Sequence, residues 1–230
     1  MKVTLLIPTR NEIDGVKQIM PRIQRDWVDE ILFVDANSTD GTLEYIKENG
    51  YKFIIQKKPG VLAAWWEGFE ASAGDAIILF SPDGNSVPEV IPPLIEKMKE
   101  GYDMVIASRY KEGAKSYDDS RITAFGNRLF TGLINLLFGG KYTDALGMYK
   151  IFKKELLMKL DLDKNKNDIF EIILAIRAAK QKLKVAEIPG DEPMRVGGQA
   201  ESRAWPGLVG RIKGGSLMVS CILKEFFTWR

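Results

Sequence analysis

The sequence predicts an α/β fold in which helices flank a mainly parallel central sheet and a helical appendage follows at the C-terminus. Two observations indicate this fold. Short strand-like runs alternate with helical patterns through residues 1–110, and these runs are apolar throughout, as in strands covered on both faces. The length of 230 residues suits one domain and an appendage. We expect a domain over 1–203, with halves at 1–110 and 111–203, and a terminal segment over 204–230.

The first half contains the regular alternation. Aliphatic and β-branched runs predict strands over residues 3–7, 30–34, 52–56, 76–80 and 103–107. Apolar residues at helical spacing, such as Ile13, Val16 and Ile19, predict the helices between them, over 12–24, 41–48, 61–73 and 88–99. Such alternation favours right-handed crossovers between parallel strands.

The second half is less regular. A polar segment containing glycine, 111–119, is typical of a mobile loop. After it the pattern predicts helices and strands over 121–138, within 143–152, and over 167–182, 184–188 and 205–230.

Composition excludes several kinds of chemistry. The chain has no histidine and one cysteine, Cys221, which excludes imidazole general bases, Ser-His couples and disulfide frameworks.

A net charge of +2 gives no indication of nucleic-acid binding. The longest uncharged stretch, 129–140, is shorter than the ~18–20 residues of a membrane span. We expect a cytoplasmic protein, either soluble or peripheral on the membrane face.

Polar residues gather where three of the predicted strands end, in segments 8–12, 35–41 and 83–85. Parallel α/β sheets bind ligands outside the carboxyl ends of their strands, so these segments should share one edge. No P-loop or G-x-G-x-x-G follows a predicted strand, and segment 35–41 lacks the glycine and glutamate positions of an EF-hand.

Asp83-Gly84-Asn85 is the most informative of these segments. Its two oxygen-bearing side chains, two residues apart, could share one Mg²⁺ or Mn²⁺ ion. The alternative is a simple turn, because Asp, Gly and Asn all favour turns. Asp35 likewise could be a turn or cap residue.

Several short motifs follow one another along the chain. They are Ile7-Pro8-Thr9-Arg10-Asn11-Glu12, 34–42, Gly74-Asp75, the Asp83 triplet, Ala107-Ser108-Arg109-Tyr110, 143–150 and 185–189. Taken in this order, the motifs resemble the family 2 glycosyltransferases, which have the GT-A fold. Within that family they are similar to the branch of dolichyl-phosphate mannose synthases and polyprenyl-phosphate glycosyltransferases.

The resemblance implies an inverting enzyme with a nucleoside-diphosphate sugar donor, UDP- or GDP-linked, and a Mg²⁺ or Mn²⁺ cofactor. It makes residues 1–110 the nucleotide-sugar half and 111–203 the acceptor half. The implied nucleotide-sugar contacts are Pro8, Thr9, Glu12, Asp35, Ser38, Asp83, Arg109 and Arg195. Asp83 and Asn85 occupy the family's D-x-D metal motif, although the second carboxylate is here an amide. Arg121 is a further phosphate candidate.

The acceptor decides the role of Asp144. A sugar hydroxyl needs a general base, and Asp144 is the candidate. A lipid phosphate is already an anion, and Asp144 would then orient a partner or a cation. We favour a polyprenyl-phosphate acceptor. A saccharide acceptor and a non-catalytic nucleotide-sugar-binding scaffold are the alternatives.

The terminal segment combines apolar and aromatic residues with interspersed Lys and Arg. Such a helix can lie in a membrane interface. It could equally pack on its own domain or on a second copy in a homodimer.

Overall fold

The computed structural model describes residues 1–165, 169–196 and 207–228. Its core is one seven-stranded sheet in the order β3-β2-β1-β4-β6-β5-β7. The strands are β1 (Val3–Thr9), β2 (Glu30–Asp35), β3 (Lys52–Ile55), β4 (Ala76–Leu79), β5 (Met104–Ser108), β6 (Lys150–Lys153) and β7 (Val185–Pro189). All neighbours pair in parallel except β6, which runs antiparallel between β4 and β5. The expected mainly parallel α/β fold is confirmed.

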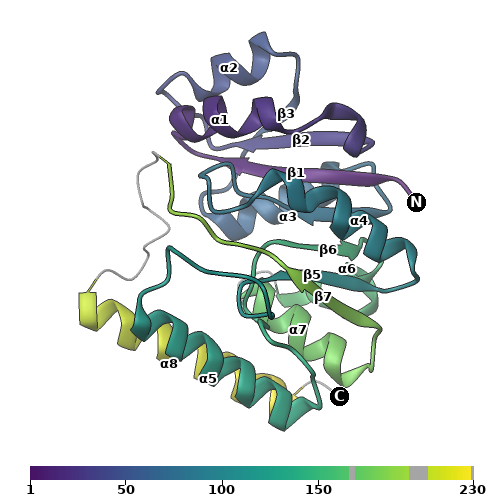
Figure 1. Cartoon of the computed structure of the whole chain (residues 1–230), viewed down its shortest axis with the longest axis vertical. Helices are drawn as coiled ribbons and strands as arrows, with labels where there is room; N and C mark the ends of the chain where they lie inside the picture. Colours follow the sequence, from purple (N-terminus) through teal and green to yellow (C-terminus); the bar gives the residue numbers. More distant parts are fainter. Residues whose placement is uncertain (166–168, 197–206, 229–230) are drawn as a thin grey trace.

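Helices cover both faces of the sheet (Figure 1). One apolar core lies under α1 (Ile13–Ile19), α2 (Thr42–Glu48) and α4 (Ile91–Lys99). The other lies under α3 (Val61–Ala71), α5 (Arg121–Phe138), α6 (Leu156–Lys159), α7 (Phe170–Lys180) and α8 (Gly207–Thr228). In Figure 1, α5 and α8 run side by side at the lower end, and α7 lies above them toward the sheet.

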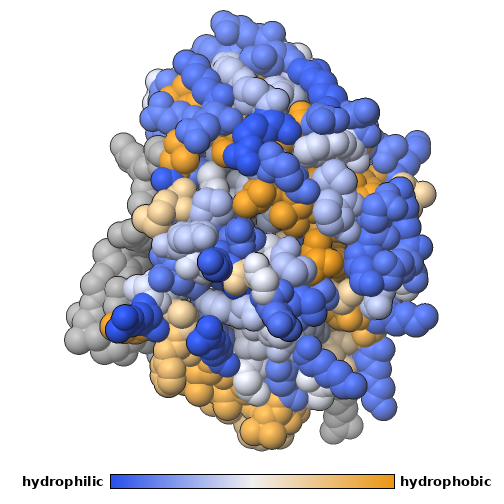
Figure 2. All heavy atoms as spheres, in the orientation of Figure 1, coloured by the Kyte–Doolittle hydropathy of each residue, from blue (hydrophilic) through white to orange (hydrophobic). Residues whose placement is uncertain are grey.

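The pair α5 and α8 leaves much of its apolar surface uncovered. In the described part of the chain, apolar side chains of α5 more than a third exposed recur along one stripe of the helix, at Ile122, Phe125, Leu129 and Leu136. Val219, Leu223, Phe226 and Phe227 do the same on α8. Figure 2 shows the resulting apolar surface at the lower end of the same view.

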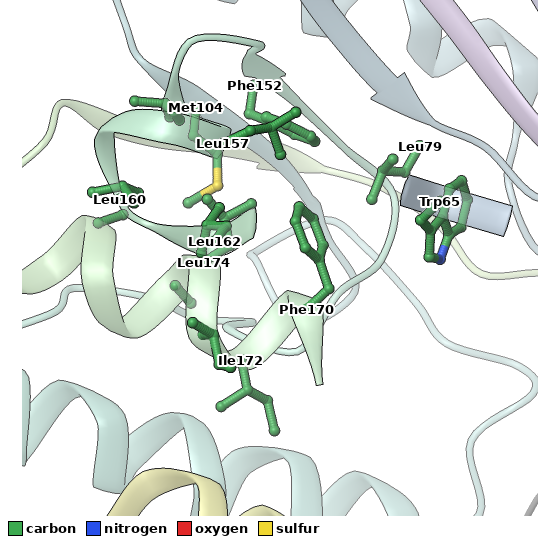
Figure 3. Packing of buried hydrophobic residues seen from close by; sticks show 14 of the residues in the cluster. Trp65, Leu79, Met104, Phe152, Leu157, Leu160, Leu162, Phe170, Ile172 and Leu174 are labelled. Carbon is green, nitrogen blue, oxygen red and sulfur yellow. The ribbon is translucent and has the colours of Figure 1, made fainter. Parts of the chain in front are cut away.

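The larger core contains an aromatic cluster between the sheet and α7. The ring of Phe69 lies 5.1 Å from Phe170 and 5.9 Å from Phe152, centroid to centroid. Figure 3 shows Phe152 and Phe170 with Leu157 of α6 and Leu174 of α7 turned into the same interior. Cys221 and Ile222 of α8 belong to this core as well, so α8 packs on its own chain.

An ion pair fixes α8 to α7 within that apolar interior. The Arg177 guanidinium donates to both carboxylate oxygens of Glu225, at 2.9 and 2.6 Å, and also to the backbone oxygens of Leu160 and Asp161. The side chains of Arg177 and Glu225 are only 2% and 1% exposed.

Several element boundaries differ by a few residues from the sequence prediction, and two of the differences have a physical reason. The helix expected over 12–24 ends at Ile19, and a 3₁₀ turn with Pro21 follows, since a proline inside a helix removes a hydrogen bond and clashes with the preceding turn. The short helix α6 was not predicted, because four residues carry too little periodicity. The expected start of the terminal helix and the division at 203/204 lie outside the described residues.

Candidate functional site

The carboxyl ends of β1 and β2 are joined through Asp35. Thr9 and Asp35 are register partners, and the Thr9 hydroxyl donates to Asp35 Oδ2 at 2.8 Å. The Ser38 amide and hydroxyl donate to the two carboxylate oxygens at 2.8 and 2.7 Å. Asp35 is fully buried. Thr9, Asp35 and Ser38 thus form one hydrogen-bonded unit that shapes the turn after β2, next to Pro8.

Further side chains hold segment 8–12 against segment 35–41, as expected for a shared edge. The Asn11 amide donates to Ser38 Oγ at 2.9 Å, and its side-chain oxygen accepts from the Thr39 amide at 2.9 Å. Asn11 has a φ of 54°, a left-handed conformation that asparagine tolerates better than most residues. The Glu12 amide donates to Thr42 Oγ1 at 2.9 Å, which places the Glu12 side chain at this edge.

The third polar segment lies beside Glu12. Burial, and next the charge of Asp83, raise the pKa of Glu12 to about 7. The Glu12 Oε2 atom is buried and has no hydrogen-bond partner. A carboxyl oxygen buried in this way is available to a ligand entering the edge.

The Asp83–Asn85 segment forms a turn, and one of its side-chain oxygens is also unsatisfied. The Asn85 amide donates to Asp83 Oδ1 at 3.1 Å, as in an Asx turn. The Asn85 side-chain nitrogen donates to Asp118 at 3.2 Å, but Asn85 Oδ1 is buried without a donor. The Asp83–Asn85 segment can therefore form a turn and still offer an oxygen atom to a metal ion.

These oxygens fit a hard divalent cation. Mg²⁺ is usually held by one or two carboxylates, waters and substrate phosphates rather than by an all-protein cage. Asp83 supplies a carboxylate, and Asn85 Oδ1 supplies an unpartnered carbonyl oxygen. Over the described residues, no three His, Cys, Asp or Glu side chains are grouped to hold a metal by themselves, so a bound substrate would have to complete the coordination.

Arg195 lies directly over this turn. Its guanidinium is 3.5 Å from Asp83 Oδ2 and 3.3 Å from Asp118 Oδ2. The next residue, Val196, donates its amide to the Asp83 carbonyl at 2.7 Å. Gly84 has a φ of 95°, and a Cβ there would stand 3.0 Å from a Val196 methyl group. The close approach of the two segments thus requires glycine at position 84.

Arg109 and Asp144 form a second cluster. The Arg109 guanidinium donates to both oxygens of the fully buried Asp144, at 2.7 and 3.0 Å. It also lies 3.4 Å from Glu192 and 3.7 Å from Asp119. Burial by itself would lower the pKa of Arg109, but the hydrogen bonds and charge of Asp144 raise it above its ordinary value. The two side chains therefore form a buried, bidentate ion pair.

Two consecutive aspartates connect the clusters to each other and to α5. Asp118 contacts Asn85 and Arg195, whereas Asp119 contacts Arg109 and accepts from the Tyr110 hydroxyl. Asn127 of α5 donates to the Tyr110 hydroxyl at 2.8 Å. Arg121 is exposed at the first turn of α5, apart from both clusters but only two residues beyond Asp119.

The sequence did not single out Asp118, Asp119, Glu192 or Lys150. The two aspartates and Glu192 lie in irregular segments, where no periodicity marks a side chain as buried. Lys150 carried a signal, because a lysine within the apolar run Tyr149–Phe152 must bury its charge if that run is a central strand.

An α/β sheet with carboxylates, an amide and arginines at its carboxyl edge has its polar side chains where doubly wound proteins bind their ligands. The comparisons give the family. The model of "Glycosyl transferase family 2" matches residues 4–161. The chain belongs to this family and is a nucleotide-sugar-dependent glycosyltransferase.

Relatives of several kinds support this assignment. A dolichol-phosphate mannosyltransferase of Pyrococcus furiosus is 28% identical over all of this chain and 72% of its own length. A dolichyl-phosphate hexose transferase of Haloferax volcanii is 26% identical over 96% of this chain and 94% of its own.

Among solved structures, glucosyl-3-phosphoglycerate synthase of Mycobacterium tuberculosis, in complex with Mn²⁺ and UDP, superposes with a TM-score of 0.67 at 20% identity. The match covers 96% of this chain and 80% of that one. It shows that the GT-A fold expected from the sequence is present.

Proposed function

We propose that this protein transfers a sugar from a nucleoside-diphosphate sugar to a polyprenyl phosphate at a membrane surface. Two relatives are named for dolichyl-phosphate acceptors. The observation that carries the proposal for this chain is the surface of α5 and α8 next to the site. No helix within the described ranges is long and apolar enough to cross a membrane.

The surface formed by α5 and α8 has the composition expected of a membrane contact. Phe125 and Leu136 of α5 are 68% and 80% exposed, and Phe227 of α8 is 77% exposed. Exposed apolar patches of this kind mark interaction sites. An acceptor with a long hydrocarbon tail requires such a surface, whereas a soluble saccharide does not.

The charge of the same surface favours anionic lipid. The sequence of α5 contains no acidic residue, and the sole acidic residue in the sequence of α8, Glu225, is buried against Arg177. Arg121, Arg128, Lys213 and Lys224 are exposed on these helices. Apolar side chains ringed by basic ones bind anionic headgroups. Because α5 begins two residues after Asp119, this surface adjoins the Arg109–Asp144 cluster.

The chemistry follows from the acceptor. A phosphate oxygen of the lipid attacks C1 of the sugar, the bond between C1 and the donor diphosphate breaks, and the nucleoside diphosphate leaves with inversion at C1. Arg195 and Arg109 would stabilise the phosphates, since guanidinium groups bind them bidentately. A divalent cation at Asp83 and Asn85 would neutralise the leaving diphosphate. Asp144 is not required as a base and would serve to orient Arg109.

Transfer assays with labelled UDP- and GDP-sugars test the acceptor. We expect labelled lipid from polyprenyl phosphate in anionic vesicles, and no product from soluble saccharides. Transfer to a saccharide without any labelled lipid would contradict the proposal and favour the saccharide alternative.

Vesicle sedimentation tests the surface separately. We expect the double variant F125Q/L136Q to bind anionic vesicles at least about tenfold more weakly than the unchanged protein. The control is Ile55→Gln, which removes an exposed apolar side chain, 40% exposed, from the opposite edge strand β3. Unchanged vesicle binding of the double variant would contradict the role of this surface in lipid contact. A dimer that the double variant dissociates would mean that a second copy of the chain covers this face instead.

A further inference from the structure

Lys150 is a buried cation that the proposed chemistry leaves unused. It is fully buried at the first position of β6, and its ammonium nitrogen has no hydrogen-bond partner. Its register partners are Leu79 of β4 and Ile106 of β5. The side chains of Leu79 and Ile106 belong to the core beneath α3, α5 and α7. Lys150 therefore lies under the carboxyl edge of the sheet, where the candidate site is.

Four charged groups surround the ammonium within electrostatic reach. They are Glu171 of α7, Asp144, Arg109, and Glu187 of β7. A Cβ on Gly147 would stand 3.0 Å from Asp144 Oδ2 and 3.4 Å from the Ile106 side chain. The Asp144 carboxylate thus borders the residue with which Lys150 pairs in register.

Asp144 is the carboxylate of this group that depends on a single cation. Glu187 accepts hydrogen bonds from the Thr143 amide and hydroxyl and from the Asp144 amide, and Glu171 is partly exposed to water. Asp144 is fully buried, and within the described residues its carboxylate accepts hydrogen bonds from the backbone amide and the guanidinium of Arg109 alone. Without a counter-ion, a carboxylate in such a place would take up a proton.

Because Asp144 depends on Arg109, the binding of a donor diphosphate to Arg109 would leave the Asp144 carboxylate without its counter-ion. The guanidinium that would contact a donor diphosphate is already bonded to Asp144 on two of its nitrogens. If it turns toward the diphosphate, it withdraws the charge that keeps Asp144 ionised. A nearby cation without a hydrogen-bond partner can replace that charge, and Lys150 is such a cation.

We propose that Lys150 is a positioning residue that acts as the reserve counter-ion of Asp144 when Arg109 engages the diphosphate of the donor. The inference rests on the proposed donor site. It assigns Lys150 no contact with substrate. The ammonium keeps Asp144 ionised and in place, so that Arg109 can exchange one partner for another without proton uptake.

The test counts protons taken up when a nucleotide binds. UDP or GDP, whichever the unchanged protein binds with Mn²⁺, is titrated calorimetrically at pH 6.5 in buffers of low and high ionisation enthalpy. In Lys150→Met, Asp144 should take up about 0.5–1 proton more per nucleotide than in the unchanged protein, because a buried carboxylate without a counter-ion has a raised pKa. Lys150→Arg should restore the original proton count.

Two further variants make the result specific. Lys150→Gln repeats the neutral change with a polar side chain, should the methionine variant fail to fold. Lys153→Met removes a lysine at the other end of the same strand, where it pairs with Asp103 at 2.7 Å, and should leave proton uptake unchanged. Equal proton uptake in all variants would overturn the role of Lys150 while leaving the donor site intact. Failure of the unchanged protein to bind either nucleotide would overturn both.

Discussion

The buried ion pair between Arg177 and Glu225 gives a prediction about how α8 is held. In Glu225→Gln the shape of the side chain is kept, but the guanidinium of Arg177 loses its counter-charge in a place where it is only 2% exposed. Removing one partner of a buried pair costs about 3–5 kcal/mol. Arg177 keeps its bonds to the backbone oxygens of Leu160 and Asp161, so we expect the lower end, about 3 kcal/mol.

For a chain of this length, about 3 kcal/mol corresponds to a fall in melting temperature of about 6–12 °C. Scanning calorimetry or circular dichroism would measure it. The matched control is Glu96→Gln, which breaks an equally short pair with Lys99, at 2.7 Å, whose side chains are 70% and 59% exposed. An exposed pair contributes about 0–1 kcal/mol, so this control should melt close to the unchanged protein.

The melting temperatures of the two variants show whether the buried pair stabilises the fold. A melting temperature of Glu225→Gln within about 2 °C of the control would refute the reasoning. It would mean that water reaches Arg177, or that α8 leaves the core without unfolding the rest. Replacing both partners, as R177M/E225M, should recover part of the loss, because no unpaired charge remains.

Three further outcomes are expected. Asp83→Ala should abolish sugar transfer in kinetic assays and the effect of Mn²⁺ on nucleotide affinity in titration calorimetry, while the melting temperature stays unchanged. Wild-type turnover of this variant would mean that Asp83 is not part of the metal site. Asn85→Asp should tighten Mn²⁺ binding by restoring a second carboxylate charge, and unchanged affinity would show that the amide oxygen already suffices. Burial lowers the pKa of Lys150 from 10.5 to about 8. The buried ammonium therefore destabilises the folded state fully below pH 8, and this destabilisation disappears as the pH rises to 10.5. In denaturant titrations, the free energy of unfolding of Lys150→Met relative to the unchanged protein should therefore be about 3 kcal/mol higher at pH 7 than at pH 10.5. A difference between the two proteins that stays constant across that range would contradict the pKa shift.

The strands and the edge where the site lies could be predicted because their signals are local. An apolar run such as 76–80 followed by Asp83-Gly84-Asn85 carries both the strand and the end of the strand in a few adjacent residues. The right-handed crossover rule then places three such ends together. Glu12 bears this out, because its amide donates to Thr42 at the start of α2 and its carboxylate lies within electrostatic reach of Asp83.

The pairing of charges could not be predicted in the same way. Asp144 and Arg195 meet partners that are 35 and 77 residues away in the sequence, and no periodicity relates them. The direction of β6 is equally hidden, since the same four residues would pair in either sense. The sequence therefore indicated which segments meet at this edge of the sheet, whereas the partners of their charged side chains depend on the tertiary packing of irregular segments such as 111–119.

The position of Arg195 couples the binding of a divalent cation to the binding of the nucleotide. The guanidinium lies 3.5 Å from Asp83 Oδ2, the same carboxylate that a divalent cation would need, so the two positive charges compete for it. A diphosphate that draws the guanidinium away leaves that carboxylate to the cation. Cation and nucleotide would then strengthen each other's binding by the same factor, as thermodynamic linkage requires. Such an enzyme would bind little metal in the absence of its donor and would take up the metal together with the donor.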